Sequence, residues 1–344
     1  MSRLALALAA GLLAGCGQIS YLAQAAQGHL ALLQAARPIP DWLADPATPA
    51  PLRERLARAQ AMRDFAVREL HLPDNDSYRR YADLGRSAAV WNVVAAPELS
   101  LELVRSCFPL VGCIGYRGYY SEVDAQAEGQ RLAGEGYEIS VYPVPAYSTL
   151  GYANWLGGDP LLNTFALGSE DELARLMFHE LAHQVAYAPG DTAFNESFAT
   201  AVERLGLAHW RAAQGQGQAI TAPVQDARRL ALRALLLRSR EALGRLYASE
   251  VSDADKRMGK ARIMATLHSD YAELKAQWGG WAGWDPYIAR QNNATLALQG
   301  AYDDQVPAFE ALFVREGRDF TRFYAEVQRL AEWPAAERQR RWPP

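Results

Sequence analysis

The sequence has few cysteines, little net charge and no long apolar run. Three cysteines in 344 residues are too few for a disulfide-rich scaffold or a cysteine-rich zinc module. The 35 basic and 39 acidic residues nearly cancel, which argues against an electrostatic nucleic-acid binder. No run of apolar residues is long enough for an ordinary membrane-spanning helix. Half of the residues are nevertheless hydrophobic, and this predicts a globular protein with a sizeable core.

The first sixteen residues are typical of an export signal. Arg3 precedes an apolar run over 4–14 that is too short to span a bilayer. Residues 13–16 (Leu-Ala-Gly-Cys) resemble the lipobox of bacterial lipoproteins, and the resemblance implies removal of residues 1–15 and acylation of Cys16. Gly17 follows the cysteine, where an Asp would indicate inner-membrane retention, so we expect the outer membrane, facing the periplasm. The alternative is an ordinary signal peptide in which Cys16 has no special role.

Cys107 and Cys113 would be the remaining thiols of the exported chain. An oxidising periplasm would allow a small disulfide loop between them. Two buried free cysteines are an equal alternative, because spacing alone does not establish the geometry that a disulfide needs.

The pattern of apolar residues predicts an α+β fold that is mainly helical. β-branched and aromatic residues indicate strands over 88–95, 114–120 and 138–142, with a helix over 121–134. Helical periodicity predicts further helices at 19–36, 52–70, 170–187, 192–213, 223–249, 253–278 and 304–332. We expect one domain over residues 16–344, with a helical N-terminal extension over about 16–75. A small mixed or antiparallel sheet should precede the later helices.

The residues His-Glu-Leu-Ala-His at 179–183 predict a metal site. Side chains four residues apart lie on one face of a helix, so the imidazoles of His179 and His183 can bind the same ion. Glu180 lies between them and is expected to act as a general base that takes a proton from an activated water. A hydrolytic zinc site also needs a third protein ligand and one open position.

Three carboxylates after the motif are candidates for the third ligand. Pro189 and Gly190 predict a turn between two antiparallel helices. His183 and Glu196 lie equally far from the centre of this turn, so Glu196 is the expected ligand. Glu203 lies two helical turns further along the same face and is expected to bind substrate or to hydrogen-bond a ligand. Asp191 lies in the turn itself and would have to reach back.

Residues 179–183, followed by Asn-Glu-Ser-Phe-Ala at 195–199, resemble the gluzincin metallopeptidases, in which a Glu on a following helix completes the zinc site. Most of the mature chain also resembles a bacterial lipoprotein family of predicted aminopeptidases, with similar segments at 107–109, 116–119 and 159–164. The resemblance implies a zincin-like fold, one zinc ion and peptide substrates. The twelve residues between His183 and Glu196 are fewer than in the well-studied aminopeptidases.

The leading hypothesis is a zinc aminopeptidase that a lipid anchors in the bacterial envelope, with no nucleic-acid partner. Tyr302 is the candidate donor to the oxyanion, and Tyr152 is the alternative. A second hypothesis is a non-catalytic envelope lipoprotein that keeps a structural metal site and serves as a binding or assembly factor. Glu180 favours the enzyme, because a structural zinc site prefers four protein ligands and would not need this residue.

Overall fold

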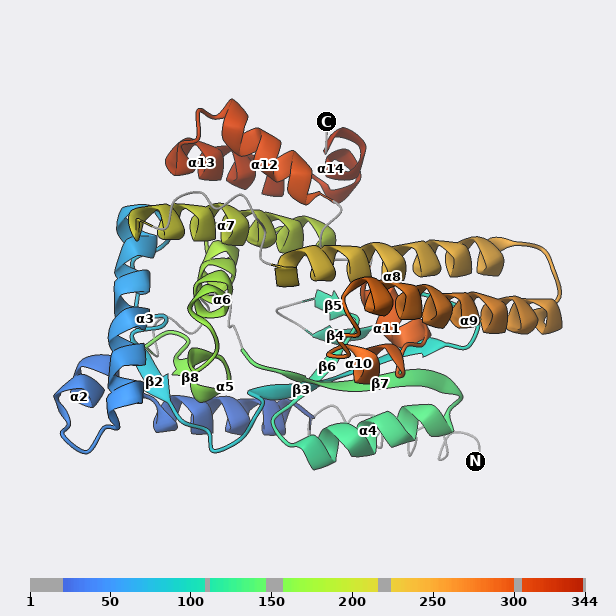
Figure 1. Ribbon diagram of the computed structural model, residues 1–344, viewed down its shortest axis with the longest axis horizontal. Helices are drawn as coiled ribbons and strands as arrows, with labels where there is room; N and C mark the ends of the chain where they lie inside the picture. The colour runs from blue at the N-terminus through green and yellow to red at the C-terminus, as the bar shows by residue number, and fades with distance from the viewer. Residues whose placement is uncertain (1–20, 109–111, 147–156, 216–223, 300–304, 343–344) are drawn as a thin grey trace, which may run out of the picture.

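The computed structural model describes residues 21–108, 112–146, 157–215, 224–299 and 305–342 (Figure 1). Within these ranges the chain is mainly helical with three small sheets, which confirms the predicted α+β class. Residues 21–35 form a helix that we call the N-terminal helix. The labelled helices are α2 (Ile39–Ala44), α3 (Ala50–Arg68), α4 (Glu122–Gly134), α5 (Asn163–Ala166), α6 (Glu170–His183), α7 (Thr192–Ala213), α8 (Val224–Ala248), α9 (Asp253–Gln277), α10 (Asp285–Ile288), α11 (Asn293–Leu298), α12 (Val306–Arg315), α13 (Phe320–Ala331) and α14 (Ala335–Arg341). The strands are β1 (Arg37–Pro38), β2 (Arg80–Ala82), β3 (Val90–Pro97), β4 (Ser106–Phe108), β5 (Gly112–Ile114), β6 (Arg117–Tyr119), β7 (Tyr137–Val144) and β8 (Leu161–Leu162).

The most extensive sheet has the strand order β6-β3-β7 and is antiparallel throughout. β3 pairs with β7 over its whole length, from Val90 opposite Val144 to Pro97 opposite Tyr137. Because side chains alternate between the two faces of a strand, β3 contributes to two separate clusters. Trp91, Val93 and Ala95 pack with Ala125 and Leu132 of α4, whereas Val94 and Ala96 pack with Ala294 of α11. The remaining sheets are β1-β2-β8, which is mixed, and the β4-β5 hairpin.

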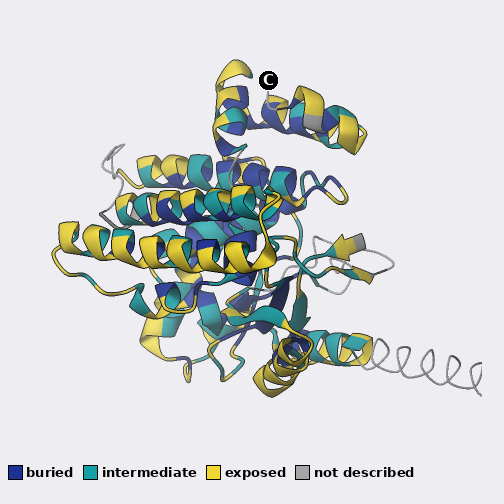
Figure 2. Ribbon diagram, turned by 90° about the vertical axis from the view of Figure 1, so that its right-hand side faces the viewer, coloured by how far each residue is buried: buried dark blue, intermediate teal, exposed yellow. Residues whose placement is uncertain are grey.

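The largest hydrophobic cluster joins the two ends of the described chain. It extends from Leu32 in the N-terminal helix to Trp342 after α14 and includes the buried sides of α3, α6, α7, α12 and α13. In Figure 1, α3 lies beside α6 and α7 on the left, and α12 to α14 lie above α7. α8 and α9 form a long hairpin that faces the viewer in Figure 2, and most of α9 is exposed there. No helix in the described ranges combines the length and the apolar character needed to cross a membrane.

The single helix predicted over 304–332 is wrong. The structure has α12 and α13 instead, because Gly317 and Arg318 take left-handed backbone angles, φ +76° and +58°, after the end of α12. Asp319 then begins α13 by accepting a hydrogen bond from the amide of Arg322.

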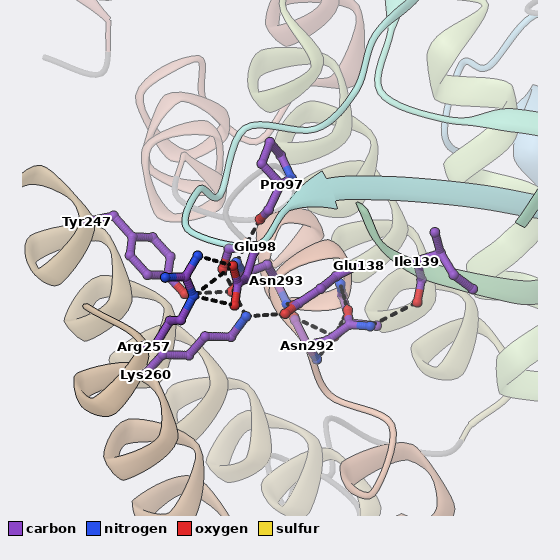
Figure 3. Close-up of polar contacts among 10 residues, drawn as sticks. Pro97, Glu98, Glu138, Ile139, Tyr247, Arg257, Lys260, Asn292 and Asn293 are labelled. Carbon is purple, nitrogen blue, oxygen red and sulfur yellow. Dashed lines mark hydrogen bonds and ion pairs between the residues drawn. The ribbon is translucent and has the colours of Figure 1, made fainter. Parts of the chain in front are cut away.

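A polar network joins α9 and α11 to the end of the β3-β7 pair (Figure 3). Arg257 of α9 donates to both carboxylate oxygens of Glu98, at 2.9 and 2.8 Å. Lys260 donates to the carbonyl of Glu98 at 2.9 Å and forms an ion pair with Glu138 of β7. The side chain of Asn293 in α11 donates to the same carbonyl at 2.7 Å, and its amide donates to Glu138 at 2.8 Å. These contacts hold the α8-α9 hairpin against the sheet.

Candidate metal centre

α6 brings both histidines of the motif to one side of a buried helix. Ser169 begins α6 with a capping box, in which its hydroxyl accepts from the amide of Glu172 and its own amide donates to the Glu172 carboxylate. The apolar side of the helix, which includes Met177, is fully buried. The rings of His179 and His183 lie edge to face with their centroids 4.9 Å apart, as the four-residue spacing requires.

α6 ends at His183, so the predicted end at Tyr187 is wrong. The amide of Gln184 bonds to the carbonyl three residues back, which tightens the last turn. The side chain of Gln184 accepts from Asn75 at 2.8 Å and donates to the hydroxyl of Ser77 at 3.2 Å. These bonds connect the end of α6 to the segment before β2, a long-range contact that local periodicity does not predict.

Asp191 caps the start of α7 and is not part of the metal group. One carboxylate oxygen accepts from the amide of Phe194 at 3.0 Å, and the other accepts from the buried guanidinium of Arg338 at 2.8 Å. Asn195 adds two hydrogen bonds between its side chain and the backbone of Ala188, at 2.7 and 2.9 Å. Both oxygens of Asp191 therefore serve to hold the α6-α7 turn and the first residues of α7.

α6 and α7 lie side by side and antiparallel, as expected from the turn at Pro189 and Gly190. Residue numbers rise along α6 while those of their partners fall along α7, as in the pairs Asp171–Arg211, Arg175–Glu203 and His183–Glu196. Glu196 consequently faces the histidines from the first turns of α7.

His179, His183 and Glu196 form a group that could hold a metal ion. Oε2 of Glu196 lies 3.3 Å from Nε2 of His179 and 3.8 Å from Nε2 of His183. One ligand atom from each residue lies within 4.8 Å of the other two. The Nε2 atoms of both rings thus approach the same carboxylate oxygen from α6.

The chemistry of these three atoms fits a divalent ion. Imidazole nitrogen and carboxylate oxygen are both common ligands of divalent transition metals. His183 is only 6% exposed, and its Nδ1 atom has no hydrogen-bond partner among the described residues. The 3.8 Å between its Nε2 atom and Glu196 is also too long for a hydrogen bond. Nε2 of His183 faces Glu196 without being hydrogen-bonded to it, so this nitrogen could bind an ion.

Excess negative charge surrounds His179. Burial alone would lower the pKa of His179, but hydrogen bonds with Glu196 and Glu203 and the charge of Glu180 raise it to about 10. Burial, assisted by the charge of His179, lowers the pKa of His183 to about 4. The metal-free site therefore carries a proton on His179 at neutral pH, while His183 is neutral. A bound cation would replace this proton, because a ligating imidazole must be neutral.

Glu203 contacts the nitrogen of His179 that faces away from Glu196. Its Oε2 atom lies 3.3 Å from Nδ1 of His179, and its Oε1 atom accepts from Arg175 at 3.0 Å. Burial would raise the pKa of Glu203, but its contacts with His179 and Arg175 hold the pKa below the ordinary value. The contact with Glu203 therefore involves Nδ1 of His179, while Nε2 of the same ring faces Glu196.

Glu180 is partly buried and lies close to the histidine pair. Its charge contributes to the raised pKa of His179, and also to the raised pKa of Tyr78 and of Tyr116, for which burial is the larger cause. The carboxylate therefore lies near both the ligand group and two phenols, where it could exchange a proton with a nearby water.

Tyr116 is a residue of the site that sequence reasoning did not identify. It lies between β5 and β6 and is 37% exposed. The surrounding protein and the charges of Glu196 and Glu180 raise the pKa of Tyr116, so its phenol stays protonated and can donate. Its place in the family-like segment 116–119 was a signal, but nothing local shows that the segment after the β4-β5 hairpin lies near Glu180 of α6 and Glu196 of α7.

Cys107 and Cys113 form a disulfide, so the structure has the bonded pair and not two free cysteines. They are direct partners in the β4-β5 hairpin, with their Cα atoms 3.8 Å apart. The bond closes the hairpin shortly before Tyr116. Four other predicted features lie outside the described residues: the signal segment 1–15, Cys16, Tyr152 and Tyr302.

Comparison with known proteins gives one match. Residues 20–342 match the model of a family described as "Putative aminopeptidase". No curated protein and no solved structure matches the chain. Because the family model covers nearly all of the 344 residues, the chain belongs to this "Putative aminopeptidase" family.

Proposed function

We propose that the protein is a zinc-dependent aminopeptidase that a lipid on Cys16 tethers to the outer membrane. The observation that carries the proposal is the meeting of His179, His183 and Glu196 beside Glu180. Membership of the aminopeptidase family supports peptides as substrates. Two imidazoles and one carboxylate are also the protein ligands of well-known catalytic zinc sites, which keep one coordination position open.

The residues of the site would have distinct roles. His179, His183 and Glu196 would hold the ion, and Glu203 would orient His179 through Nδ1. When bound, zinc supplies a Lewis acid that polarises a carbonyl and acidifies water. Glu180 would accept the proton of the attacking water and deliver it to the leaving amine.

Tyr116 is our proposed donor to the oxyanion, since its raised pKa keeps the phenol protonated near Glu180 and Glu196. We expect Tyr116→Phe to retain the metal and to lower kcat by roughly 10²–10³-fold, the cost of losing one oxyanion donor. An unchanged kcat would contradict this role and return attention to Tyr302 and Tyr152.

Glu180→Gln tests the reaction itself. We expect the metal content of this variant to equal that of the unmodified protein, because Glu180 is not among the ligand atoms, while peptide hydrolysis is lost. Peptides with a free or an acetylated amino terminus should be compared, because only an aminopeptidase requires the free amine. Glu310→Gln is the matched control, since Glu310 pairs with Arg204 of α7 on the partly exposed surface.

Each outcome of this experiment decides between hypotheses. Equal hydrolysis by Glu180→Gln and the unmodified protein would remove Glu180 from the mechanism. Cleavage of acetylated peptides would indicate an endopeptidase. Metal binding without cleavage of any peptide would favour the binding or assembly factor.

The location of the protein is tested separately. The apolar run over 4–14 and the lipobox-like residues 13–16 support export and acylation. We expect metabolic labelling with a radioactive fatty acid to mark the unmodified protein and not Cys16→Ala. Equal labelling of the two proteins would contradict a lipid anchor on Cys16.

A further inference from the structure

The N-terminal helix packs against the β6-β3-β7 sheet through one of its faces. Tyr21 lies edge-on to Tyr119 of β6, with ring centroids 5.4 Å apart. The side chain of Gln24 donates to the carbonyl of Gly118 at 3.2 Å and accepts from the amide of Tyr120 at 3.3 Å. Gly28 leaves room for the ring of Tyr120, because a Cβ atom there would lie 2.2 Å from it. These contacts fix the rotation of the helix about its axis.

The opposite face of this helix is exposed and uncharged. We call it the outer face, and it consists of Leu22, Ala23, Ala26, Gln27, Leu30, Ala31, Gln34 and Ala35, all exposed. Leu22 and Leu30 are 45% and 51% exposed. The spacing of these residues places them along one side of a helix. No Asp, Glu, Lys or Arg occurs between Arg3 and Arg37.

The neighbouring α4 is different. Both helices lie along the lower edge of the molecule in Figures 1 and 2, but α4 exposes Glu122, Asp124 and Arg131. Such charges are ordinary for a helix surrounded by water. The outer face instead offers leucine and alanine with two amides, a composition that can enter a lipid headgroup region without burying a charge.

We propose that the outer face of the N-terminal helix lies on the bilayer that receives the acyl chains of Cys16. This inference rests on the lipid anchor of the proposed function. Leu22 is six residues after Cys16, and six residues span at most roughly 20 Å even when fully extended. An acylated Cys16 would therefore keep the outer face within reach of the membrane surface.

The anchor and the outer face would have complementary effects. Two leucines and four alanines expose too little apolar surface to hold a protein on a membrane alone. Once acyl chains tether the chain, contact becomes an intramolecular event at high effective concentration, so a weak preference is sufficient. Because the opposite face of the N-terminal helix is hydrogen-bonded to β6, membrane contact would fix the orientation of the β6-β3-β7 sheet relative to the membrane. The candidate metal group would be oriented with it.

A fluorescent label tests this contact in the acylated full-length protein. Ala26→Cys places one thiol on the outer face, and Ala272→Cys places one on exposed α9 as the control. The native cysteines do not compete, because Cys16 is acylated and Cys107 is bonded to Cys113. Each protein is labelled with a polarity-sensitive dye and reconstituted into vesicles of phosphatidylethanolamine and phosphatidylglycerol. We expect nitroxide lipids to quench most of the fluorescence at position 26 and little at position 272.

A second variant shows whether the outer face causes the effect. Leu22→Glu combined with Leu30→Glu, made in the Ala26→Cys protein, should still float with vesicles but lose the quenching. Both leucines are exposed, so thermal unfolding should be unchanged. If the Ala26→Cys protein that keeps both leucines floats but its label is not quenched, the inference is overturned and the anchor stays intact. Protein that fails to float overturns both. A dimer that the two glutamates dissociate, with an unquenched label, would identify a second copy as the occupant.

Discussion

Replacing Glu203 tests whether a residue that touches no ion controls the metal centre. Glu203 connects Arg175, at 3.0 Å, to Nδ1 of His179, at 3.3 Å. Glu203→Ala removes the partner of the Nδ1 proton, so the ring of His179 loses its fixed orientation and part of its basicity. All three predicted ligands remain in this variant, so binding should weaken without being abolished.

The structure sets the expected size of this loss. A hydrogen bond to a charged group contributes about 1.5–3 kcal/mol, which corresponds to roughly 10–150-fold in a dissociation constant. Removal of partners behind metal-ligating histidines typically costs 10–100-fold in affinity, so the two figures agree. We expect Glu203→Ala to raise the Kd for zinc by about 10–100-fold. Glu203→Gln should have a smaller effect, because the amide oxygen can still accept from Nδ1.

Competition with a chromophoric chelator would measure these constants, and circular dichroism of the metal-free proteins would check folding. Glu196→Ala is the comparison, since it removes a predicted ligand, and its Kd should rise more than that of Glu203→Ala. Glu310→Gln is the control on the neighbouring helix α12 and should leave the Kd unchanged. Unchanged affinity of Glu203→Ala would refute the supporting role of Glu203. Equal losses for Glu203→Ala and Glu196→Ala would refute the distinction between the two carboxylates.

Three further predictions concern protonation and packing. Because the pKa of His179 is raised to about 10, zinc binding near neutral pH should release about one proton, and the affinity for zinc should rise about tenfold for each unit of increasing pH. Calorimetry in buffers of different ionisation enthalpy would measure the number of protons released. A value of zero would contradict the prediction. Arg338→Met leaves the buried carboxylate of Asp191 without its cation, so the free energy of unfolding measured with urea should fall by about 3–5 kcal/mol. A fall below about 1 kcal/mol would contradict the importance of this pair. Gly206→Ala would place a Cβ atom 2.8 Å from the ring of Phe178. Overpacking typically costs about 1–3 kcal/mol and should exceed the gain of about 1 kcal/mol in helix propensity, so the melting temperature should fall; a rise would show that the ring can move aside.

Local sequence patterns predicted how the candidate metal group is assembled. The four-residue spacing of His179 and His183 places both rings on one side of any helix that contains them. Pro189 and Gly190 predicted a turn between two antiparallel helices, and Glu196 does lie opposite the histidines, although α6 already ends at His183. Each of these inferences depends on residues within about one helical turn or on a count along the chain, so the sequence alone was sufficient.

The tertiary structure decided which polar groups share a partner. Asp191 and Glu203 are both carboxylates near the motif, yet Asp191 pairs with Arg338 near the C-terminus, whereas Glu203 bonds to His179. Tyr116 lies near Glu180 and Glu196 although it precedes His179 by more than sixty residues. The short strands β1, β2 and β8 likewise pair across long separations and have too few residues to show a period. Such contacts form only when whole faces of helices and sheets pack together. The residues next to each partner in the sequence therefore do not predict them.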